Sequence, residues 1–233
     1  MFVEGFRLDL EYWFKPLPEG TLTSEWTKTT ALFHSIYFIS IILPIMWVAI
    51  NLEELRTVAI IYLIIGLWIN LISITERLSP PKVPWSFMPV RFENFIQQTL
   101  AALIILAITV MSGIQISSFV PFTIMAPPSQ IVSIIKIYLW QFGFLSLEES
   151  FFGQYLGATL CEKIGIIPGA LINAVIFVGF HYSMYGWAAN ILISLFIFRF
   201  LGSIANAIYR SMVPSAETHF LINLIALKSI GAY

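Results

Sequence analysis

Two adjacent carboxylates, Glu148 and Glu149, interrupt a long apolar stretch of the chain. His181 follows in the next apolar stretch, and His219 and Asn223 lie in the last one. Ionisable side chains in such surroundings are costly to bury and usually mark a functional site. A carboxylate can act as general base toward water, histidine and asparagine can donate to an oxyanion, and histidine can ligate a metal. Together these residue types could hydrolyse a peptide bond.

The spacing of these residues favours a shared pocket between helices. His219 and Asn223 are four residues apart, as are Phe177 and His181, and residues at this spacing lie on one face of a helix. The sequence contains neither HExxH nor GxSxG, so it lacks the zincin arrangement and the serine elbow. A serine–histidine mechanism stays open, because three serines lie near the cluster: Ser146, Ser150 and Ser183.

Each of these residues also has a structural interpretation. If a helix began with Ser146 as its N-cap, the two glutamates would lie in its first turn, where acidic groups are favourable. His181 could bond to a neighbouring helix, and His219 with Asn223 could join two helices as polar side chains do in membranes. Arg199 lies inside an apolar stretch and is interpreted as a snorkelling or salt-bridged structural residue.

The composition indicates a membrane protein. Of the 233 residues, 58% are hydrophobic and only 11% are charged, whereas a soluble domain carries about 25% charged residues. We therefore predict an all-α, polytopic helical membrane protein with about seven or eight transmembrane helices. A net charge of −1 gives no basic signature for nucleic acid, and the single cysteine, Cys161, cannot form an internal disulfide.

One integral membrane domain in three parts is expected. Residues 1–30 form an interfacial segment with aromatic anchors, residues 31–130 hold the N-terminal transmembrane helices, and residues 131–233 hold the C-terminal helices with the acidic pair. Because roughly 20 residues span a bilayer, residues 131–162 form one long tilted helix or two helices with a break near Gly143. Gly165 and Pro168 mark a turn and the next helix start. The predicted spans are 31–50, 57–75, 97–118, 131–162, 167–186, 187–209 and 214–230.

The distribution of Lys and Arg predicts a cytoplasmic N-terminus. With seven spans, one side of the membrane receives only Arg56 and Lys228. The chain does not begin with a cleavable signal pattern, so the first span is expected to serve as its own insertion signal. The other side receives eight basic residues: Arg7, Lys15, Lys28, Arg77, Lys82, Arg91, Lys163 and Arg210.

Three short motifs in the last third of the chain resemble those of the CPBP intramembrane protease family, also called the Abi family, which includes the type II CAAX prenyl endopeptidases. The motifs are Glu148-Glu149, Phe177-x-x-x-His181 and His219-x-x-x-Asn223, and the resemblance covers about residues 145–230. It implies an integral membrane hydrolase, placed in the plasma membrane of a prokaryote.

The resemblance also implies roles for the residues of the site. Glu148 would activate the attacking water, and Glu149 would belong to the same catalytic set. His181 would orient that water or ligate a metal, and His219 and Asn223 would stabilise the oxyanion. If a zinc ion is used, its ligands would be Glu148, His181 and His219; a metal-independent glutamate mechanism is the alternative.

The first motif departs from the family pattern at Gly153. The family motif is EExxxR, and its arginine is thought to pair with the second glutamate, whereas this chain has glycine there. Gly153 and Gly157 form a GxxxG pattern, which favours close helix packing and offers a structural reason for the glycine. Glu149 could be protonated, or it could have another partner: Arg199, Arg210 or Gln154.

The sequence therefore predicts a CPBP-type endopeptidase, of the metallo or glutamate type, acting on membrane-associated or lipidated (CAAX-type) substrates. Its partners would be membrane lipid and a peptide or lipidated protein. A non-catalytic family member acting as a membrane scaffold or immunity-type protein is one alternative, motivated by the missing arginine. A small-solute transporter that uses buried acids is another. The substrate, the need for a prenyl group and the oligomeric state stay open.

Overall fold

The computed structural model of the chain describes residues 13–18, 20–22, 46, 60, 63–64, 94–112, 145–185 and 188–229. The part of the chain so described is helical and contains no strand, which confirms the all-α prediction. The predicted spans 31–50 and 57–75 lie almost wholly outside the described residues, and so does Gly143, where a break was expected.

The helices with established bounds can be compared with the predicted spans by their position along the chain. Three of them agree with the predictions to within about two residues at each end, which is the usual uncertainty of helix boundaries. The first described helix ends at Met111, before the predicted residue 118, and Ser112 Oγ closes its last turn by donating to Thr109 O at 2.6 Å. The elements are α4 (Phe95–Met111), α6 (Leu145–Glu148), η5 (Glu149–Gly157), α7 (Ala158–Ile164), α8 (Ile166–Tyr185), α9 (Ala189–Tyr209) and α10 (Val213–Ser229).

The acidic pair lies where an α-helix passes into a π-helix. α6, η5 and α7 follow one another without interruption, and η5 has the π-helical form. π-helical turns are rare and are frequently found at functional sites. Ser146 lies inside α6, so the interpretation of this serine as an N-cap is wrong. The two glutamates instead occupy the junction of α6 and η5.

Gly165 makes the turn between α7 and α8. Its φ of 100° lies in the region that favours glycine, and its N–H donates to Cys161 O at 3.1 Å. A Cβ at this position would come within 2.7 Å of the backbone of Phe14. Pro168 follows in the first turn of α8, where proline is tolerated. The predicted turn and helix start are therefore confirmed.

The N-terminal segment of residues 13–22 is held against this turn by Glu162. The Glu162 carboxylate accepts the N–H groups of Gly20 at 2.5 Å and Leu22 at 3.3 Å, and its backbone carbonyl accepts the N–H of Leu17 at 2.8 Å. Leu17 and Leu22 are buried in a cluster with Cys161. The segment thus covers one end of the α7–α8 pair.

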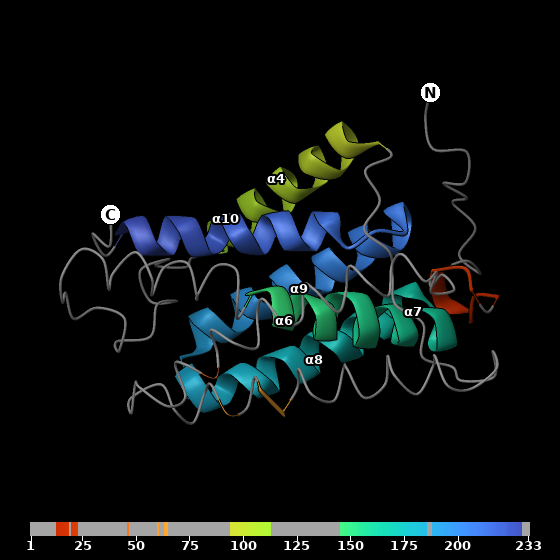
Figure 1. Cartoon of the computed structure of the whole chain (residues 1–233), viewed down its shortest axis with the longest axis horizontal. Coiled ribbons are helices and arrows are strands. Elements are labelled where there is room, and N and C mark those ends of the chain that lie inside the picture. Colours follow the sequence, from red (N-terminus) through yellow and green to blue (C-terminus); the bar gives the residue numbers. More distant parts are fainter. Residues whose placement is uncertain are drawn as a thin grey trace.

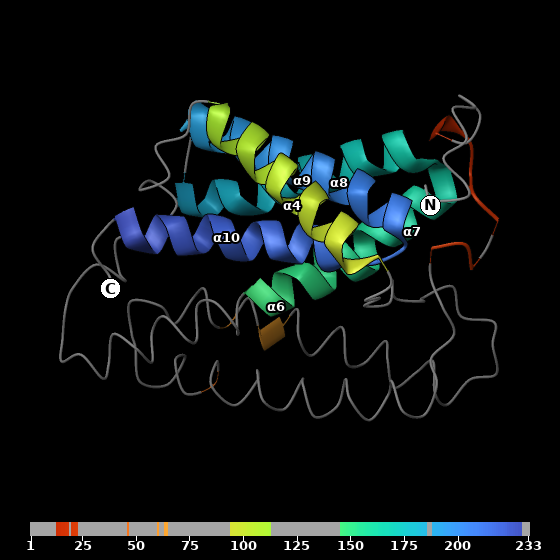
Figure 2. The same ribbon diagram turned by 90° about the horizontal axis from the view of Figure 1, so that it is seen from above.

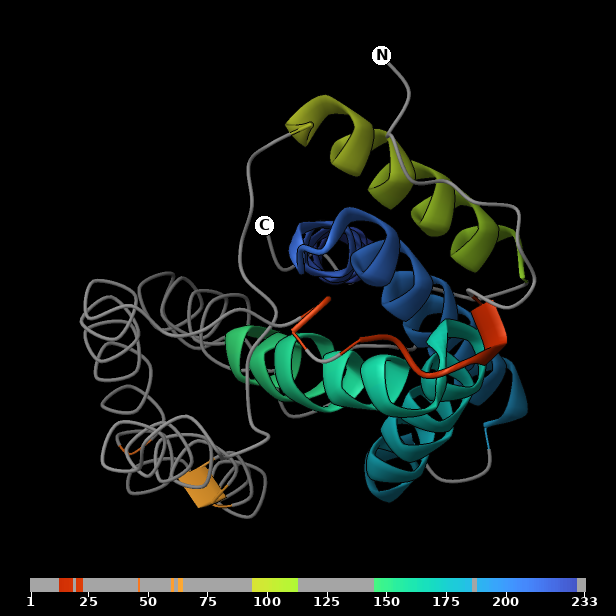
Figure 3. The ribbon, with the colours of Figure 1, turned by 90° about the vertical axis from the view of Figure 1, so that its right-hand side faces the viewer.

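α9 is the central helix of the described fold. It contacts α4, α7, α8, α10 and η5, and the end-on view shows α4 and α10 on one side of it and the α6–η5–α7 segment with α8 on the other (Figures 1 and 3). Seen from above, α4 crosses α9 at an angle (Figure 2). A helix in this position can bring η5 and α10 together over its surface.

α9 is also the described helix best suited to cross a membrane. Ala189–Tyr209 is long and apolar enough by length and composition, whereas Phe95–Met111 and Ile166–Tyr182 are apolar but shorter. Its 21 residues rise about 31 Å at 1.5 Å each, close to the thickness of a hydrocarbon core. This finding supports membrane association.

Two glycines of α8 have opposite surroundings. A Cβ on Gly169 would lie 2.4 Å from the backbone nitrogen of Cys161, because α7 packs directly against this position. A Cβ on Gly179 would meet nothing within 4 Å. α8 is therefore tightly packed at its first half and open at Gly179.

We expect Gly169→Ala to destabilise the protein by about 1–3 kcal/mol, because α7 and α8 must move apart. Gly179→Ala is the matched control on the same helix, and we expect it to be neutral or to stabilise by up to about 1 kcal/mol, because alanine is the better helix former. Thermal unfolding in detergent compares the two. Equal unfolding temperatures would contradict the close packing of α7 on α8.

Candidate active site

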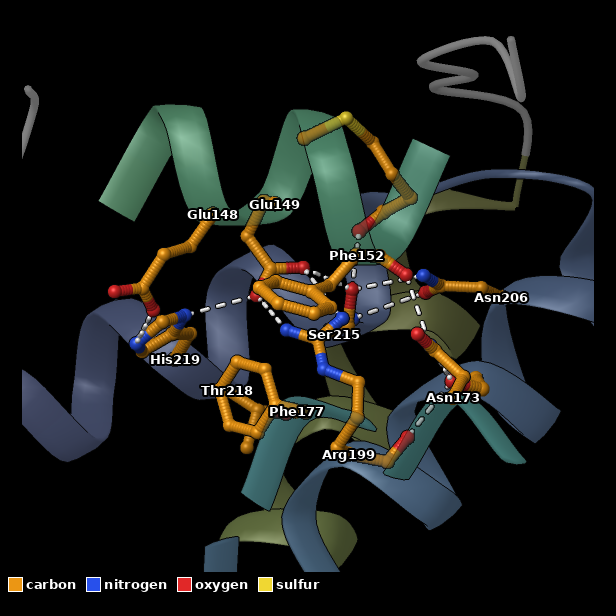
Figure 4. A network of polar contacts seen from close by, with 12 residues as sticks. Glu148, Glu149, Phe152, Asn173, Phe177, Arg199, Asn206, Ser215, Thr218 and His219 are labelled. Carbon is orange, nitrogen blue, oxygen red and sulfur yellow. Dashed lines mark hydrogen bonds and ion pairs between the residues drawn. The ribbon is translucent and has the colours of Figure 1, made fainter. Parts of the chain in front are cut away.

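Three of the predicted site residues converge from three helices. Glu148 Oε2 lies 3.7 Å from His181 Nε2 and 3.5 Å from His219 Nε2. Glu148 comes from the end of α6, His181 from α8 and His219 from α10. All three are buried, with 5–8% of their surface exposed. Figure 4 shows Glu148 turned toward the His219 ring.

Glu149 is saturated with hydrogen bonds on both of its carboxylate oxygens. Oε1 accepts from His219 Nδ1 at 2.8 Å and from Arg199 Nη2, while Oε2 accepts from Ser215 Oγ at 2.6 Å and Arg199 Nη1 at 3.3 Å. The side chains of Glu149 and Arg199 are completely buried. Figure 4 shows these contacts meeting at the Glu149 carboxylate.

Arg199 provides the positive charge beside Glu149, since position 153, where an arginine was expected, is a glycine. A Cβ on Gly153 would lie 2.9 Å from Glu149 Oε2 and 3.6 Å from Arg199 Nη1. The glycine therefore leaves room for a guanidinium that arrives from α9, across the helix interface. Arg210, the other candidate arginine, caps the C-terminus of α9 in a left-handed conformation with φ of 50°. The interpretation of Arg199 as a salt-bridge partner is confirmed, and snorkelling is excluded by its burial.

Aromatic rings surround the Arg199 guanidinium. Its central carbon lies 4.6 Å from the ring centroid of Phe177, 4.9 Å from Phe198 and 6.0 Å from Phe152. A cation within about 6 Å of an aromatic face is attracted by the ring quadrupole. The cage offsets part of the cost of removing the charge from water. It also fixes the plane of the guanidinium and hence its orientation toward Glu149.

The hydrogen bonds of both histidines assign the same tautomer. His219 Nδ1 faces a carboxylate oxygen, and His181 Nδ1 faces the carbonyl of Phe177 at 2.9 Å. Both partners only accept, so the proton is assigned to Nδ1 in each ring. In the neutral rings both Nε2 lone pairs then point toward Glu148. Glu148 Oε2 is buried and has no hydrogen-bond partner among the described residues.

Two histidine nitrogens with lone pairs thus lie within 3.7 Å of Glu148 Oε2, and this arrangement attracts a hydrogen-bond donor or a cation. The donor types suit zinc, and metal-ligating histidines commonly donate their other N–H to a carboxylate or a backbone carbonyl. Among the described residues, however, no three His, Cys, Asp or Glu side chains are arranged to hold a metal ion. The zinc site formed by Glu148, His181 and His219 therefore stays a prediction.

Asn223 is the remaining residue of the predicted set, and three serines lie near the cluster in the sequence. Asn223 is buried and lies one turn beyond His219 on α10, so the two side chains share a helix face. Ser150 is buried within η5. The side chains of Ser146 and Ser183 lie outside the described part of the structure.

Several polar residues of the site were not predicted. Asn206 receives the Ser215 N–H on its Oδ1 at 3.1 Å and donates from Nδ2 to Ser215 Oγ at 2.8 Å. Asn173 donates to Phe152 O and to Ser203 Oγ, each at 2.9 Å. The sequence did contain a pattern that could have predicted Ser215. This residue lies four positions before His219 and therefore shares its helix face.

No family model, curated protein or solved structure matches this chain. The assignment of the site therefore depends on its geometry.

The buried ion pair between Glu149 and Arg199 is expected to stabilise the folded protein. We expect Glu149→Gln and Arg199→Met each to destabilise the protein by about 3–5 kcal/mol, because each leaves a buried charge without its partner. The double variant should be destabilised by clearly less than the sum of the two single losses of stability, because neither buried charge then remains. Unfolding of the four proteins in the same detergent completes the cycle, and additive losses would contradict the pairing.

Proposed function

We propose that the chain is an integral membrane endopeptidase with seven or eight transmembrane helices, in which Glu148 activates a water molecule. The arrangement of polar and apolar groups supports the membrane part. α4 has no charged residue, and apart from Gln97 its large exposed side chains are apolar, including Ile96 at 74% and Met111 at 85% exposed. Charged and amide side chains such as Arg199, Glu149 and Asn206 lie inside. Such a surface suits lipid better than water.

The catalytic part of the proposal is supported by one observation: Glu148 Oε2 lies 3.7 Å from His181 Nε2 and 3.5 Å from His219 Nε2. A general base must reach the proton that it removes, directly or through one water. A water at this point can donate one hydrogen to the carboxylate and the other to a histidine nitrogen. Its oxygen then presents a lone pair to a substrate carbonyl.

The proposed reaction follows from these roles. Glu148 removes a proton from the water molecule while the water oxygen forms a bond with the carbonyl carbon of the substrate. The carbonyl oxygen then becomes an oxyanion. Asn223 Nδ2–H can donate to that oxyanion, as side-chain amides do in acyl transfer. When the intermediate collapses, the C–N bond breaks and Glu148 returns the proton to the leaving nitrogen.

The histidine tautomers modify the role expected for His219. With Nδ1–H committed to Glu149, the neutral His219 ring accepts at Nε2 and helps to orient the water, as His181 does. It could donate to an oxyanion only as an imidazolium. A zinc ion bound by Glu148, His181 and His219 would supply Lewis-acid activation of the same water. Each of the steps above is available to the side chains themselves.

The proposed substrates are peptides that reach the site from the membrane: membrane-associated segments or lipidated, CAAX-type proteins. The apolar outer faces of α4 and α8 are compatible with this route. From the resemblance of the three motifs we propose that the protein lies in the plasma membrane of a prokaryote. From the distribution of Lys and Arg we propose that its N-terminus is cytoplasmic. The absence of the motif arginine was the reason for considering a non-catalytic scaffold. Because Arg199 pairs with Glu149, that reason no longer applies.

We expect Glu148→Gln to abolish cleavage of peptides in proteoliposomes while the protein stays folded, because the amide cannot accept the proton. Glu217→Gln is the matched control on a half-buried glutamate of α10 that bonds to Thr99 rather than to the site. Mass spectrometry of a library of free and prenylated peptides measures cleavage. Full activity of Glu148→Gln would refute the assignment.

Asn223→Ala should lower kcat about 10²–10³-fold if its amide binds the oxyanion, the loss seen when one such donor is removed. KM should change little, because the interaction forms only in the transition state. The same liposome assay gives both constants. A variant with unchanged kcat would remove Asn223 from the mechanism.

Chelation separates the two versions of the chemistry. For the metal-independent version proposed here, we expect cleavage to persist after treatment with a strong zinc chelator and removal of the chelated metal. Metal content is measured on the same sample. Loss of activity that added zinc restores would instead assign Glu148, His181 and His219 as ligands.

A further inference from the structure

We infer that Arg199 is a positioning residue for the proposed hydrolysis: it acts through Glu149 on the His219 ring, and Gly153 provides the space that it needs. This inference rests on the proposed function. It concerns an ion pair formed between two helices, η5 and α9, and an additional hydrogen bond from Ser215 on α10.

Glu149 has no free oxygen with which to touch a substrate. Each of its two carboxylate oxygens is already engaged twice, by Arg199 with His219 on one side and by Arg199 with Ser215 on the other. The carboxylate is completely buried. Glu149 was predicted as a member of the catalytic set, and these contacts support an indirect role.

The indirect role is the orientation of His219. Because Glu149 Oε1 can only accept, it holds the proton on Nδ1 and turns Nε2 toward Glu148. A ring without this partner could carry its proton on Nε2. It would then donate to Glu148 directly and occupy the lone pair that the water needs.

Arg199 keeps the Glu149 carboxylate in place. Two adjacent carboxylates in an apolar interior repel each other, and a paired guanidinium removes that cost for one of them. The planar fork of arginine contacts both Glu149 oxygens, so it also fixes the rotation of the carboxylate. The rings of Phe177 and Phe198 fix the guanidinium in turn.

Ser215 is the second anchor of the same carboxylate. Its Oγ donates to Glu149 Oε2 at 2.6 Å, while Asn206 bonds to both the hydroxyl and the backbone N–H of Ser215. The chain Asn206–Ser215–Glu149–His219 therefore links the α9–α10 connection to the site, as Figure 4 shows. Arg199 and Ser215 approach Glu149 Oε2 beside Gly153, where a Cβ would also lie 3.5 Å from Ser215 Oγ.

The test uses two variants that disturb this arrangement without removing a charge. Gly153→Ala places a methyl group 2.9 Å from Glu149 Oε2, and Arg199→Lys keeps the charge but loses the planar fork. Gly179→Ala is the matched control, because its Cβ meets open space. If Gly153→Ala does not fold, Ser215→Ala takes its place.

We expect kcat to fall about 10–100-fold in Gly153→Ala and Arg199→Lys, by analogy with the loss seen when the partner behind a metal-ligating histidine is removed. KM should stay within about twofold, because substrate contacts are unchanged. Gly179→Ala should match the wild type. In ¹⁵N spectra, His219 of the wild type should show Nδ1–H, and both variants should show a mixture of tautomers.

The two readouts separate this inference from the proposed function. If the wild-type protein cleaves peptides but both variants keep full kcat and the wild-type tautomer, Arg199 is not a positioning residue and the function stands. If the wild-type protein cleaves nothing, the proposed function fails, and the ¹⁵N spectra still decide whether Arg199 controls the His219 ring.

Discussion

The fold around the site depends on one buried ion pair, between Glu149 of η5 and Arg199 of α9. Removing two such charges from water costs several kcal/mol for each ion, and the attraction between them repays this only with good geometry and further hydrogen bonds. The structure meets both conditions through the arginine fork, the Ser215 hydroxyl, the His219 ring and the aromatic cage. Because these groups come from several helices, the same contacts fix the relative positions of η5, α8, α9 and α10.

This pair also explains how adjacent glutamates can have different roles. Glu149 is neutralised and saturated, so it is fixed as a hydrogen-bond acceptor for His219. Glu148 has an oxygen with no hydrogen-bond partner among the described residues, facing two histidine nitrogens. Glu148 ends α6 and Glu149 begins the π-helix η5, so the two glutamates lie on either side of this junction.

Much of the site could be predicted from residue types and spacing. Glu148, His181 and His219 are costly to bury in apolar helices, so their presence there pointed to a common pocket, and the structure brings them together. Gly165 and Pro168 predicted the turn before α8 because both have strong backbone preferences. The face shared by Ser215, His219 and Asn223 was also present in the sequence at intervals of four residues.

Other features depended on tertiary structure. Which cation would pair with Glu149 could not be chosen between Arg199 and Arg210, because the answer depends on how α9 packs on η5. The π-helix has no simple sequence pattern, and the geometry at Gly153 becomes clear only when the guanidinium is seen beside it. The Ser146 cap was wrong because α6 already includes that residue.

The central claim is that Glu148 and the two histidines form one water-activating centre. An experimental density map of the protein in lipid, at a resolution that shows ordered water, tests this most directly. We expect density for a water molecule within hydrogen-bonding distance of Glu148 Oε2 and of at least one histidine Nε2. A map in which Glu148 turns away from both rings and bonds to another protein group would contradict it.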